Sequence, residues 1–264
     1  MSKFIAAMDH SGGSTGGVLE RYGQEYTEEN KMELVHDMRL RMVNSPDFVN
    51  ENIWAAILYR DTVERGMVSI LKEKGIEAYL KVDAGCEDNG TLKDFDIAEM
   101  IEIAQWSGCT GTKMRSIVKD VEDMDRILAQ QFALAEQIAD AGLMPIVEPE
   151  IPIEHEDKEL YEYKLRDMLA EKLSAFSSQC ILKLTLPDNP NFYSSTMQSE
   201  SVHMVVGLSG GYTTEEACRR LATQRGMSAS FSRGLSEGLR IDQTDEEFNA
   251  HISRNIQAIK EAGK

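Results

Sequence analysis

Residues 127–147 read ILAQQFALAEQIADAGLMPIV, in which a helical pattern leads directly into a strand pattern. Apolar residues recur at steps of three and four as far as Gly142, as they do on one face of an amphipathic helix. The apolar run at residues 144–147 is typical of a short buried strand, and a similar run at 109–114 precedes the helix. The segment therefore predicts a strand–helix–strand unit.

The same alternation continues along the whole chain, without a linker or a break in composition. It predicts eight strands, at residues 4–8, 53–58, 78–82, 109–114, 144–147, 180–185, 202–208 and 228–231. Thr213-x-x-Glu216 and Thr244-x-x-Glu247 read as capping boxes that open two of the helices, whereas the helix after the sixth strand has little room. Parallel pairing of alternating elements, and a length near the roughly 250 residues of a (β/α)₈ barrel, predict one such domain over residues 1–264.

Composition and charge exclude several classes of protein. A net charge of −17 argues against a nucleic-acid partner, because a phosphate backbone requires clustered Lys and Arg. No apolar run reaches the length of a membrane span, and the N-terminal segment has too few apolar residues for a signal peptide, so we expect a cytoplasmic protein. The four cysteines and five histidines are scattered, which predicts no disulfide framework, metal site or bound cofactor.

Charged residues collect where the predicted strands end, which is where (β/α)₈ barrels place their active sites. They are Asp9, Lys81, Lys113, Arg115, Glu148 and Lys183. Lys183 is the most informative, because it stands inside an apolar strand where an unpaired ammonium is costly and the neutral, nucleophilic amine is favoured. A buried lysine paired with a carboxylate is the alternative interpretation.

Two carboxylates accompany these lysines. Glu148 ends a hydrophobic strand and is followed by a proline that fixes the turn, so its carboxyl group is a candidate for proton transfer. A salt bridge to a barrel lysine would be its purely structural role. Asp9 could equally be a turn or cap residue.

Two glycine-rich loops predict anion binding. Ser209-Gly210-Gly211 follows the seventh strand and precedes a capped helix, and Ser232 and Arg233 follow the eighth strand, where barrels commonly hold phosphate. The run from Ser11 to Ser14 offers similar hydroxyl and glycine chemistry after the first strand. Together with the lysines, these loops predict a phosphorylated carbonyl substrate and imine chemistry.

The motifs resemble those of class I fructose-bisphosphate aldolase, especially its shorter bacterial form. The blocks that carry the resemblance are residues 4–14, Leu80-Lys81-Val82-Asp83, Gly111-Thr112-Lys113-Met114-Arg115-Ser116, Val147-Glu148-Pro149-Glu150, Leu182-Lys183-Leu184-Thr185, Leu208-Ser209-Gly210-Gly211 and Ser230-Phe231-Ser232-Arg233. They occur in order, one to a strand, over almost the whole chain. A metal-dependent aldolase would need a histidine cluster at the strand ends, which this sequence does not offer.

The resemblance implies a role for each matching residue in cleavage of fructose 1,6-bisphosphate. Lys183 would form the Schiff base, Glu148 would act as its acid and base, Lys113 would keep the site positive, and Asp9 would take the C4 hydroxyl proton. The remaining matches imply substrate binding: Ser209, Gly210, Gly211, Ser232 and Arg233 near the ketone phosphate, and Ser11, Ser14, Lys81 and Arg115 at the far end.

One departure from the family pattern bears on the far phosphate. The lysine that the family usually places three residues after Ser14 is Gly17 here, and Arg21, one helical turn later, could supply the missing charge. Another Schiff-base sugar-phosphate aldolase, a transaldolase-like barrel and a non-catalytic sugar-phosphate-binding barrel are the alternative functions. The sequence leaves open whether the chain forms a homo-oligomer.

Overall fold

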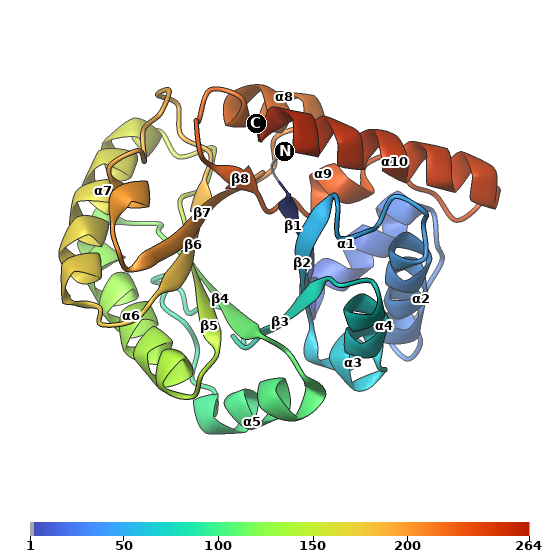
Figure 1. The fold of residues 1–264 in the computed structure, drawn as a ribbon, viewed down its shortest axis with the longest axis horizontal. Helices are drawn as coiled ribbons and strands as arrows, with labels where there is room; N and C mark the ends of the chain where they lie inside the picture. Colours follow the sequence, from blue (N-terminus) through green and yellow to red (C-terminus); the bar gives the residue numbers. More distant parts are fainter. Residues whose placement is uncertain (1–2, 264) are drawn as a thin grey trace.

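A computed structural model describes residues 3–263 of the chain. Its centre is one sheet of eight parallel strands in the order of the sequence, surrounded by helices (Figure 1). The strands are β1 (Phe4–Met8), β2 (Ile53–Leu58), β3 (Glu77–Lys81), β4 (Gly111–Ile117), β5 (Met144–Glu150), β6 (Cys180–Thr185), β7 (Val202–Leu208) and β8 (Ser228–Ala229). The predicted (β/α)₈ architecture is confirmed, and four of the strand predictions match to the residue.

The barrel is nearly closed where its first and last strands meet. β8 has two residues, fewer than the four predicted, and in the part of the chain that the structure describes the sheet runs from β1 to β8 with no ladder between β8 and β1. Beyond the end of β8, the carbonyl of Phe231 still accepts a hydrogen bond from the backbone N–H of Ala7, at 3.2 Å. Within the described residues the two strands thus form no regular ladder at the seam, although they remain joined there.

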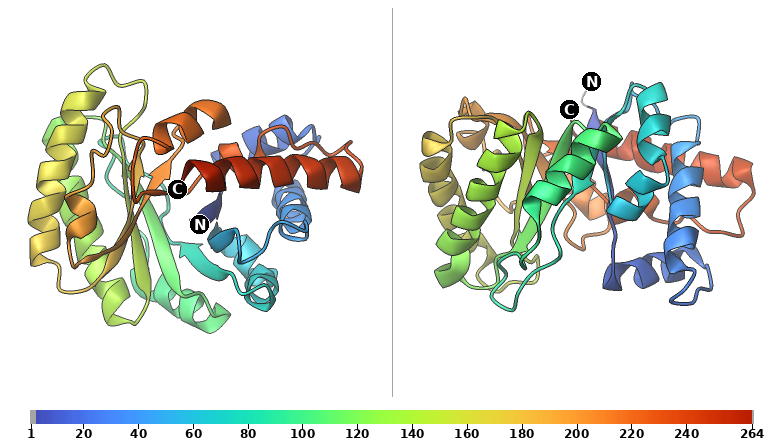
Figure 2. Two further views of the ribbon diagram at one scale, coloured as in Figure 1. Left: turned by 45° about the horizontal axis from the view of Figure 1, so that its top comes forward. Right: turned by 90° about the horizontal axis from the view of Figure 1, so that it is seen from below.

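The helices lie outside the strands in every view (Figure 2). They are α1 (Gly13–Tyr22), α2 (Lys31–Val43), α3 (Arg60–Glu64), α4 (Met67–Glu73), α5 (Ile97–Ser107), α6 (Met124–Asp140), α7 (Lys158–Ala175), α8 (Thr214–Leu221), α9 (Arg233–Ser236) and α10 (Asp245–Ala262), with short 3₁₀ turns at Val121–Asp123 and Thr196–Gln198. The latter turn is all the helix that the described chain places between β6 and β7, so the helix expected there is not formed.

Capping explains where two of the helices begin. The Thr213 side chain accepts a hydrogen bond from the backbone N–H of Glu216 at the start of α8. At the start of α10, Thr244 and Glu247 form a complete capping box, in which each side chain accepts from the other residue's backbone N–H. Such contacts satisfy N–H groups that have no partner within the helix.

The core has two layers, because neighbouring residues of a strand point to opposite sides of the sheet. The outer layer packs the strands against the helices and includes Leu182 and Leu184 of β6. The inner layer fills the barrel with Ile5, Ala7, Ala55, Ile57, Tyr79, Ile146, Ile181 and Val206. This inner plug closes the barrel interior below the carboxyl ends of the strands.

Candidate active site

The alternation along each strand turns the charged residues of the sequence toward the barrel axis. Lys183 stands two residues beyond Ile181, which belongs to the inner layer, so both side chains share one face of β6. The same two-residue step separates Asp9 from Ala7, Lys81 from Tyr79 and Glu148 from Ile146, and these three lower residues all belong to the inner layer. The charged groups therefore form the floor of a site above the plug.

A cavity of ≈ 670 Å³ opens at this end of the barrel. Every candidate site residue predicted from the sequence lines it except Gly211. Gly211 stands beside the lining at φ 124°, and a Cβ atom added there would lie 3.3 Å from the guanidinium of Arg233. The cavity also exposes residues that the sequence did not single out as candidates, among them His10, Tyr59, Asp83 and Glu150.

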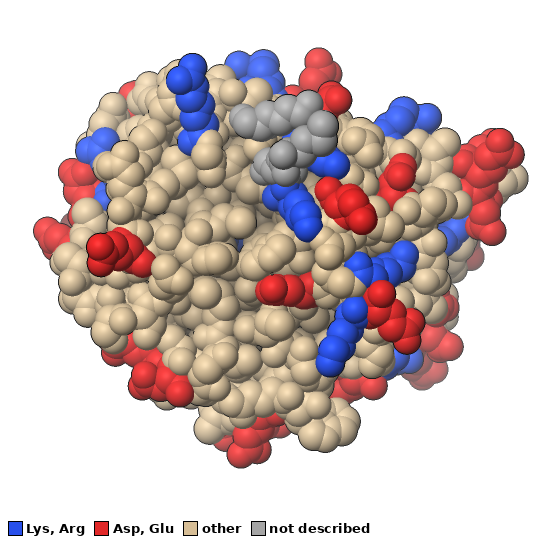
Figure 3. All heavy atoms as spheres, viewed as in Figure 1, with Lys and Arg blue, Asp and Glu red and all other residues tan. Residues whose placement is uncertain are grey.

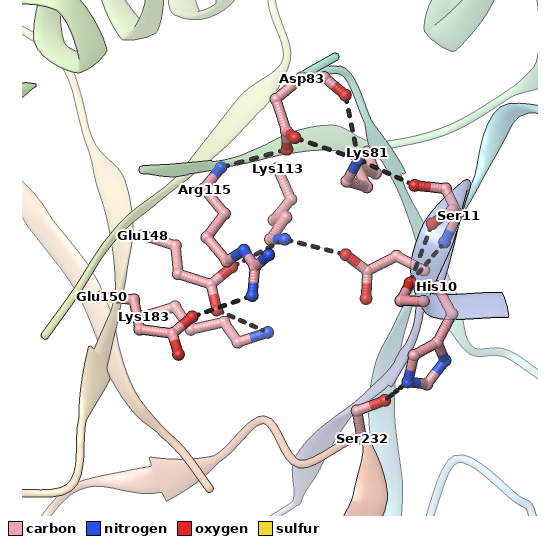
Figure 4. A network of polar contacts seen from close by, with 12 residues as sticks. His10, Ser11, Lys81, Asp83, Lys113, Arg115, Glu148, Glu150, Lys183 and Ser232 are labelled. Atoms are coloured by element: carbon pink, nitrogen blue, oxygen red, sulfur yellow. Dashed lines mark hydrogen bonds and ion pairs between the residues drawn. The ribbon is translucent and has the colours of Figure 1, made fainter. Parts of the chain in front are cut away.

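The floor of the cavity is a continuous chain of alternating charges (Figure 4). Lys183 Nζ lies 3.2 Å from one carboxylate oxygen of Glu148, and the other oxygen lies 2.8 Å from Lys113 Nζ. Lys113 Nζ also donates a hydrogen bond of 2.9 Å to Asp9. Three of these side chains are no more than 5% exposed, so little water screens the charges.

Electrostatic interactions determine the protonation states of Asp9 and Lys113 in this row of charged side chains. Burial opposes ionisation of Asp9, but the charges of Lys113 and Lys183 outweigh burial and hold the pKa of Asp9 well below its usual range. Burial likewise disfavours the Lys113 ammonium, but Asp9 and Glu148 outweigh it and raise the pKa of Lys113 above its usual range. Asp9 is therefore a carboxylate and Lys113 a cation at neutral pH.

A second group of polar residues stands on the side of β1 and β3. Lys81 Nζ donates hydrogen bonds to the Ser11 hydroxyl at 3.1 Å and to the carbonyl of Asp83 at 3.0 Å, and lies 3.0 Å from the Asp83 carboxylate. The Ser14 hydroxyl donates to the carbonyl of Ser11. This side thus presents hydroxyl groups and one ammonium to a ligand.

Arg115 is held between strands. Nη1 of Arg115 lies 3.1 Å from Oε2 of Glu150, and the backbone N–H of Arg115 donates a hydrogen bond of 3.2 Å to the carboxylate of Asp83. Burial raises the pKa of Glu150 although Arg115 opposes this, whereas in Arg115 the charges of Glu150 and Glu148 outweigh burial and raise the pKa. An anion entering from this side would compete with Glu150 for the guanidinium.

A further part of the cavity wall is formed by the loops after β7 and β8. Ser209, Gly210, Ser232 and Arg233 line it, and Gly210 adopts φ 57°, a left-handed conformation that favours glycine. Among residues 3–263, Arg21 and Arg233 are the lining cations that form no ion pair with a carboxylate. In a chain with 45 Asp and Glu residues, two arginines left without a carboxylate in one cavity favour an anionic ligand.

The electrostatic setting of the site differs from that of the surface. Figure 3 shows acidic side chains scattered around the edge of one face of the molecule, in keeping with a net charge of −17. The cavity instead gathers six Lys and Arg residues against four Asp and Glu residues, Lys81, Lys113, Lys183, Arg21, Arg115 and Arg233 against Asp9, Asp83, Glu148 and Glu150. It is a local positive site on an acidic protein.

The described residues also bear on metal binding, disulfides and membrane insertion. Within residues 3–263, no cluster of His, Cys, Asp and Glu has a geometry suited to a metal ion, and all four cysteines are free thiols. No helix in that part of the chain is long and apolar enough to cross a membrane.

Some residues that line the cavity could have been found from the sequence. Asp83 and Glu150 each lie two residues beyond a predicted site residue, Lys81 and Glu148, and so fall on the same side of the chain as those residues. His10 carries no such signal. Its partner, the Ser232 hydroxyl 2.9 Å from Nε2, comes from the other end of the chain.

Proteins of a known family match this chain over most of its length. The family model for class I fructose-bisphosphate aldolase matches residues 1–182. Class 1 fructose-bisphosphate aldolases from Clostridium acetobutylicum and Synechocystis are each 41% identical over 278 residues, covering 98% of this chain and 94% and 93% of the relatives.

Two solved structures share the fold. The fructose-bisphosphate aldolase of Plasmodium falciparum, solved with TRAP and a small-molecule inhibitor, superposes with a TM-score of 0.79 at 20% identity, over 99% of this chain and 90% of that one. An archaeal fructose 1,6-bisphosphate aldolase gives a TM-score of 0.62 at 10% identity, over 98% and 94% of the two chains. At these identities the structures support the barrel alone, whereas the sequence matches over nearly the whole length show that this chain belongs to the class I fructose-bisphosphate aldolase family.

Proposed function

We propose that this enzyme cleaves fructose 1,6-bisphosphate reversibly to dihydroxyacetone phosphate and glyceraldehyde 3-phosphate through a Schiff base on Lys183. The reaction class, aldol cleavage by a lysine imine in glycolysis and gluconeogenesis, follows from membership of the family. The observation that carries the residue assignment is the buried pair of Lys183 and Glu148, with 3.2 Å between Nζ and Oε1.

Formation of the imine requires two proton transfers that Glu148 is placed to perform. Its carboxylate takes a proton from the Lys183 ammonium, which frees the amine to attack the C2 carbonyl of the ketose. The protonated carboxyl then delivers a proton to the hydroxyl group of the carbinolamine, which leaves as water. The Lys113 ammonium lies 2.8 Å from the other oxygen of Glu148 and keeps the carboxylate between the two lysines.

Asp9 is suited to the step that breaks the carbon–carbon bond. Its carboxylate takes the proton from the C4 hydroxyl, the C3–C4 bond breaks to give the aldehyde, and the bonding electrons pass into the protonated imine to form an enamine. The Lys113 ammonium, 2.9 Å away, keeps Asp9 ionised before this transfer. Protonation of the enamine and hydrolysis of the imine release the ketone product and restore the lysine.

The two sides of the cavity suit the two phosphates. Ser209, Gly210, Ser232 and Arg233, with Gly211 beside them, would hold the phosphate next to the ketone, in the position where (β/α)₈ barrels commonly bind phosphate. Ser11, Ser14, Lys81 and Arg115 would face the other end of the sugar. We expect the reaction to take place in the cytoplasm, because sugar phosphates are too polar to cross a membrane unaided.

Reduction with borohydride tests the proposal directly. In the presence of dihydroxyacetone phosphate, it should fix the triose to Lys183, as located by peptide mass spectrometry, and Lys183→Met should abolish trapping and turnover. Lys158→Met is the matched control, because Lys158 is equally buried but pairs with Glu162 outside the cavity. Trapping at Lys81 or Lys113 would show that the nucleophile was assigned wrongly, and binding without turnover would favour a non-catalytic sugar-phosphate barrel.

A further inference from the structure

The loops that follow β1 and β8 meet across the least connected seam of the barrel. Among residues 3–263 no regular ladder joins their strands, and the Ala7–Phe231 hydrogen bond is one backbone contact between the two segments. Beyond that bond, the two loops are joined by side chains. Contacts between their side chains therefore help to fix the position of one loop relative to the other.

The principal contact is between His10 and Ser232 (Figure 4). The imidazole Nε2 of His10 and the Ser232 hydroxyl form a hydrogen bond of 2.9 Å, and both residues line the cavity. Burial lowers the pKa of His10 to about 4, although the charge of Asp9 opposes this. The ring is therefore neutral at physiological pH, and its hydrogen bond to Ser232 is that of an uncharged imidazole.

A buried arginine, Arg39, holds the backbone of His10 through a hydrogen bond to its carbonyl. Arg39 of α2 is only 1% exposed, and it donates hydrogen bonds to the His10 carbonyl at 2.7 Å and to the Thr62 hydroxyl at 2.5 Å. Its guanidinium forms no ion pair with any carboxylate in the described chain. Burying an unpaired guanidinium costs free energy of folding. The hydrogen bond that it donates to the His10 carbonyl fixes the position of the turn that carries His10.

The residues on either side of this contact belong to the proposed machinery. Asp9 and Ser11 flank His10 and bond to Lys113 and Lys81 respectively. Ser232 precedes Arg233, a lining cation without an ion-pair partner among residues 3–263. The His10–Ser232 contact thus connects the turn that holds the proton acceptor with the loop that holds the phosphate.

We propose that His10 is a positioning residue, which Arg39 holds in place and which orients the Ser232 hydroxyl and the following Arg233 toward the phosphate next to the ketone. This role rests on the proposed function, because it presupposes that the loop after β8 binds that phosphate. His10 itself transfers no proton in the reaction. It acts through Ser232, so the effect of its loss should depend on the phosphate of the substrate.

A double-mutant cycle on His10→Ala and Ser232→Ala tests the role, with His10→Gln as the conservative variant because its side-chain amide can reach the position of Nε2. Each single alanine variant should raise the KM for fructose 1,6-bisphosphate and for fructose 1-phosphate about 10-fold, the scale of one hydrogen bond to a charged group, with little change in kcat. The double variant should lose no more than Ser232→Ala alone, because His10 acts only through the Ser232 hydroxyl. His10→Gln should recover most of the loss.

Two controls separate this role from general damage and from the proposed function. His203→Ala removes an exposed histidine at the start of β7, outside the cavity, and should leave the kinetics unchanged. Borohydride trapping of unphosphorylated dihydroxyacetone at Lys183 should survive in His10→Ala, and failure of that trapping in the wild type would count against the Schiff base rather than against His10.

Three outcomes would overturn the role of His10. The first is an unchanged KM in His10→Ala. The second is a rise in KM that multiplies to about 100-fold in the double variant. The third is a loss of dihydroxyacetone trapping in His10→Ala as large as its loss of dihydroxyacetone phosphate trapping.

Discussion

Oε1 of Glu148 lies 3.2 Å from Nζ of Lys183, and the two side chains are 3% and 5% exposed. At that distance a proton can pass between them without an intervening water. Since Lys113 holds the other oxygen of Glu148 at 2.8 Å, the carboxylate cannot turn away from the lysine without breaking an ion pair. Glu148 is thus oriented toward the nitrogen before substrate arrives.

Glu148→Gln should lower turnover by about 10² or more, the typical contribution of positioned proton transfer, while substrate binding is retained. The amide preserves the shape of the side chain but cannot exchange a proton with Lys183. Steady-state kinetics and a direct binding measurement check the two parts separately. Glu162→Gln is the control, because Glu162 is equally buried and also pairs with a lysine, but outside the cavity. Near-normal turnover in Glu148→Gln would leave Glu148 a structural role only.

Cleavage should survive prolonged treatment with EDTA. In the proposed reaction the protonated imine on Lys183 accepts the electrons of the broken bond, so no metal ion is required to stabilise the enamine. The measurement is turnover before and after chelation, followed by addition of Zn²⁺. Activity that disappears on chelation and returns with zinc would contradict the imine mechanism.

The charge on Asp9 should make the free energy of unfolding depend on pH in the acidic range. The pKa of Asp9 is lowered in the fold from an ordinary value of 3.8, so its stabilising effect is complete above about pH 4. Below that pH the unfolded chain binds the proton more readily than the folded protein, and the stabilisation is lost. The difference in urea midpoint between wild type and Asp9→Asn should therefore narrow from pH 7 to pH 3. A difference that stays constant across this range would show that the ion pair with Lys113 contributes nothing to stability.

Local patterns were sufficient to predict the barrel and the inward direction of its charged residues. Each strand can be recognised from a short apolar run. The two-residue period that turns Ile181 into the barrel interior also turns Lys183 toward the barrel axis, above Ile181. The length of β8 was predicted wrongly. Residues 228–231 are all buried, as in a strand, and Ser230 and Phe231 still form backbone hydrogen bonds to Gly207 and Ala7, but the regular strand ends at Ala229.

Contacts between distant parts of the chain were beyond such patterns. Lys113 and Asp9 are 104 residues apart in the sequence, and Ser232 and His10 are 222 residues apart. The local sequence around each of these residues therefore does not indicate its partner. The resemblance to the aldolases implied that Lys113 and Asp9 share a site. It gave no role to His10, whose contact with Ser232 became visible only in the folded chain.

The proposed site of the far phosphate is where this chain departs from the pattern expected for the family, at Gly17. Ser14, Gly17 and Arg21 fall on one face of α1 and all line the cavity. A Cβ atom added at Gly17 would lie 3.5 Å from Nη1 of Arg21, so the guanidinium lies back over the glycine. With no side chain at position 17, Arg21 has room to reach the far end of a bound sugar.

Arg21→Ala should therefore lower kcat/KM for fructose 1,6-bisphosphate several-fold more than for fructose 1-phosphate. The expected loss is about 1 kcal/mol or more, for one exposed charged contact to a phosphate. Gly17→Lys in the Arg21→Ala background should restore the preference, whereas Gly17→Ala should not, since it adds bulk without charge. Arg225→Ala, which removes an exposed arginine outside the cavity, controls for the change in net charge. If neither Arg21→Ala nor Gly17→Lys alters the ratio between the two sugars, Lys81 and Arg115 hold the far phosphate without help from Arg21.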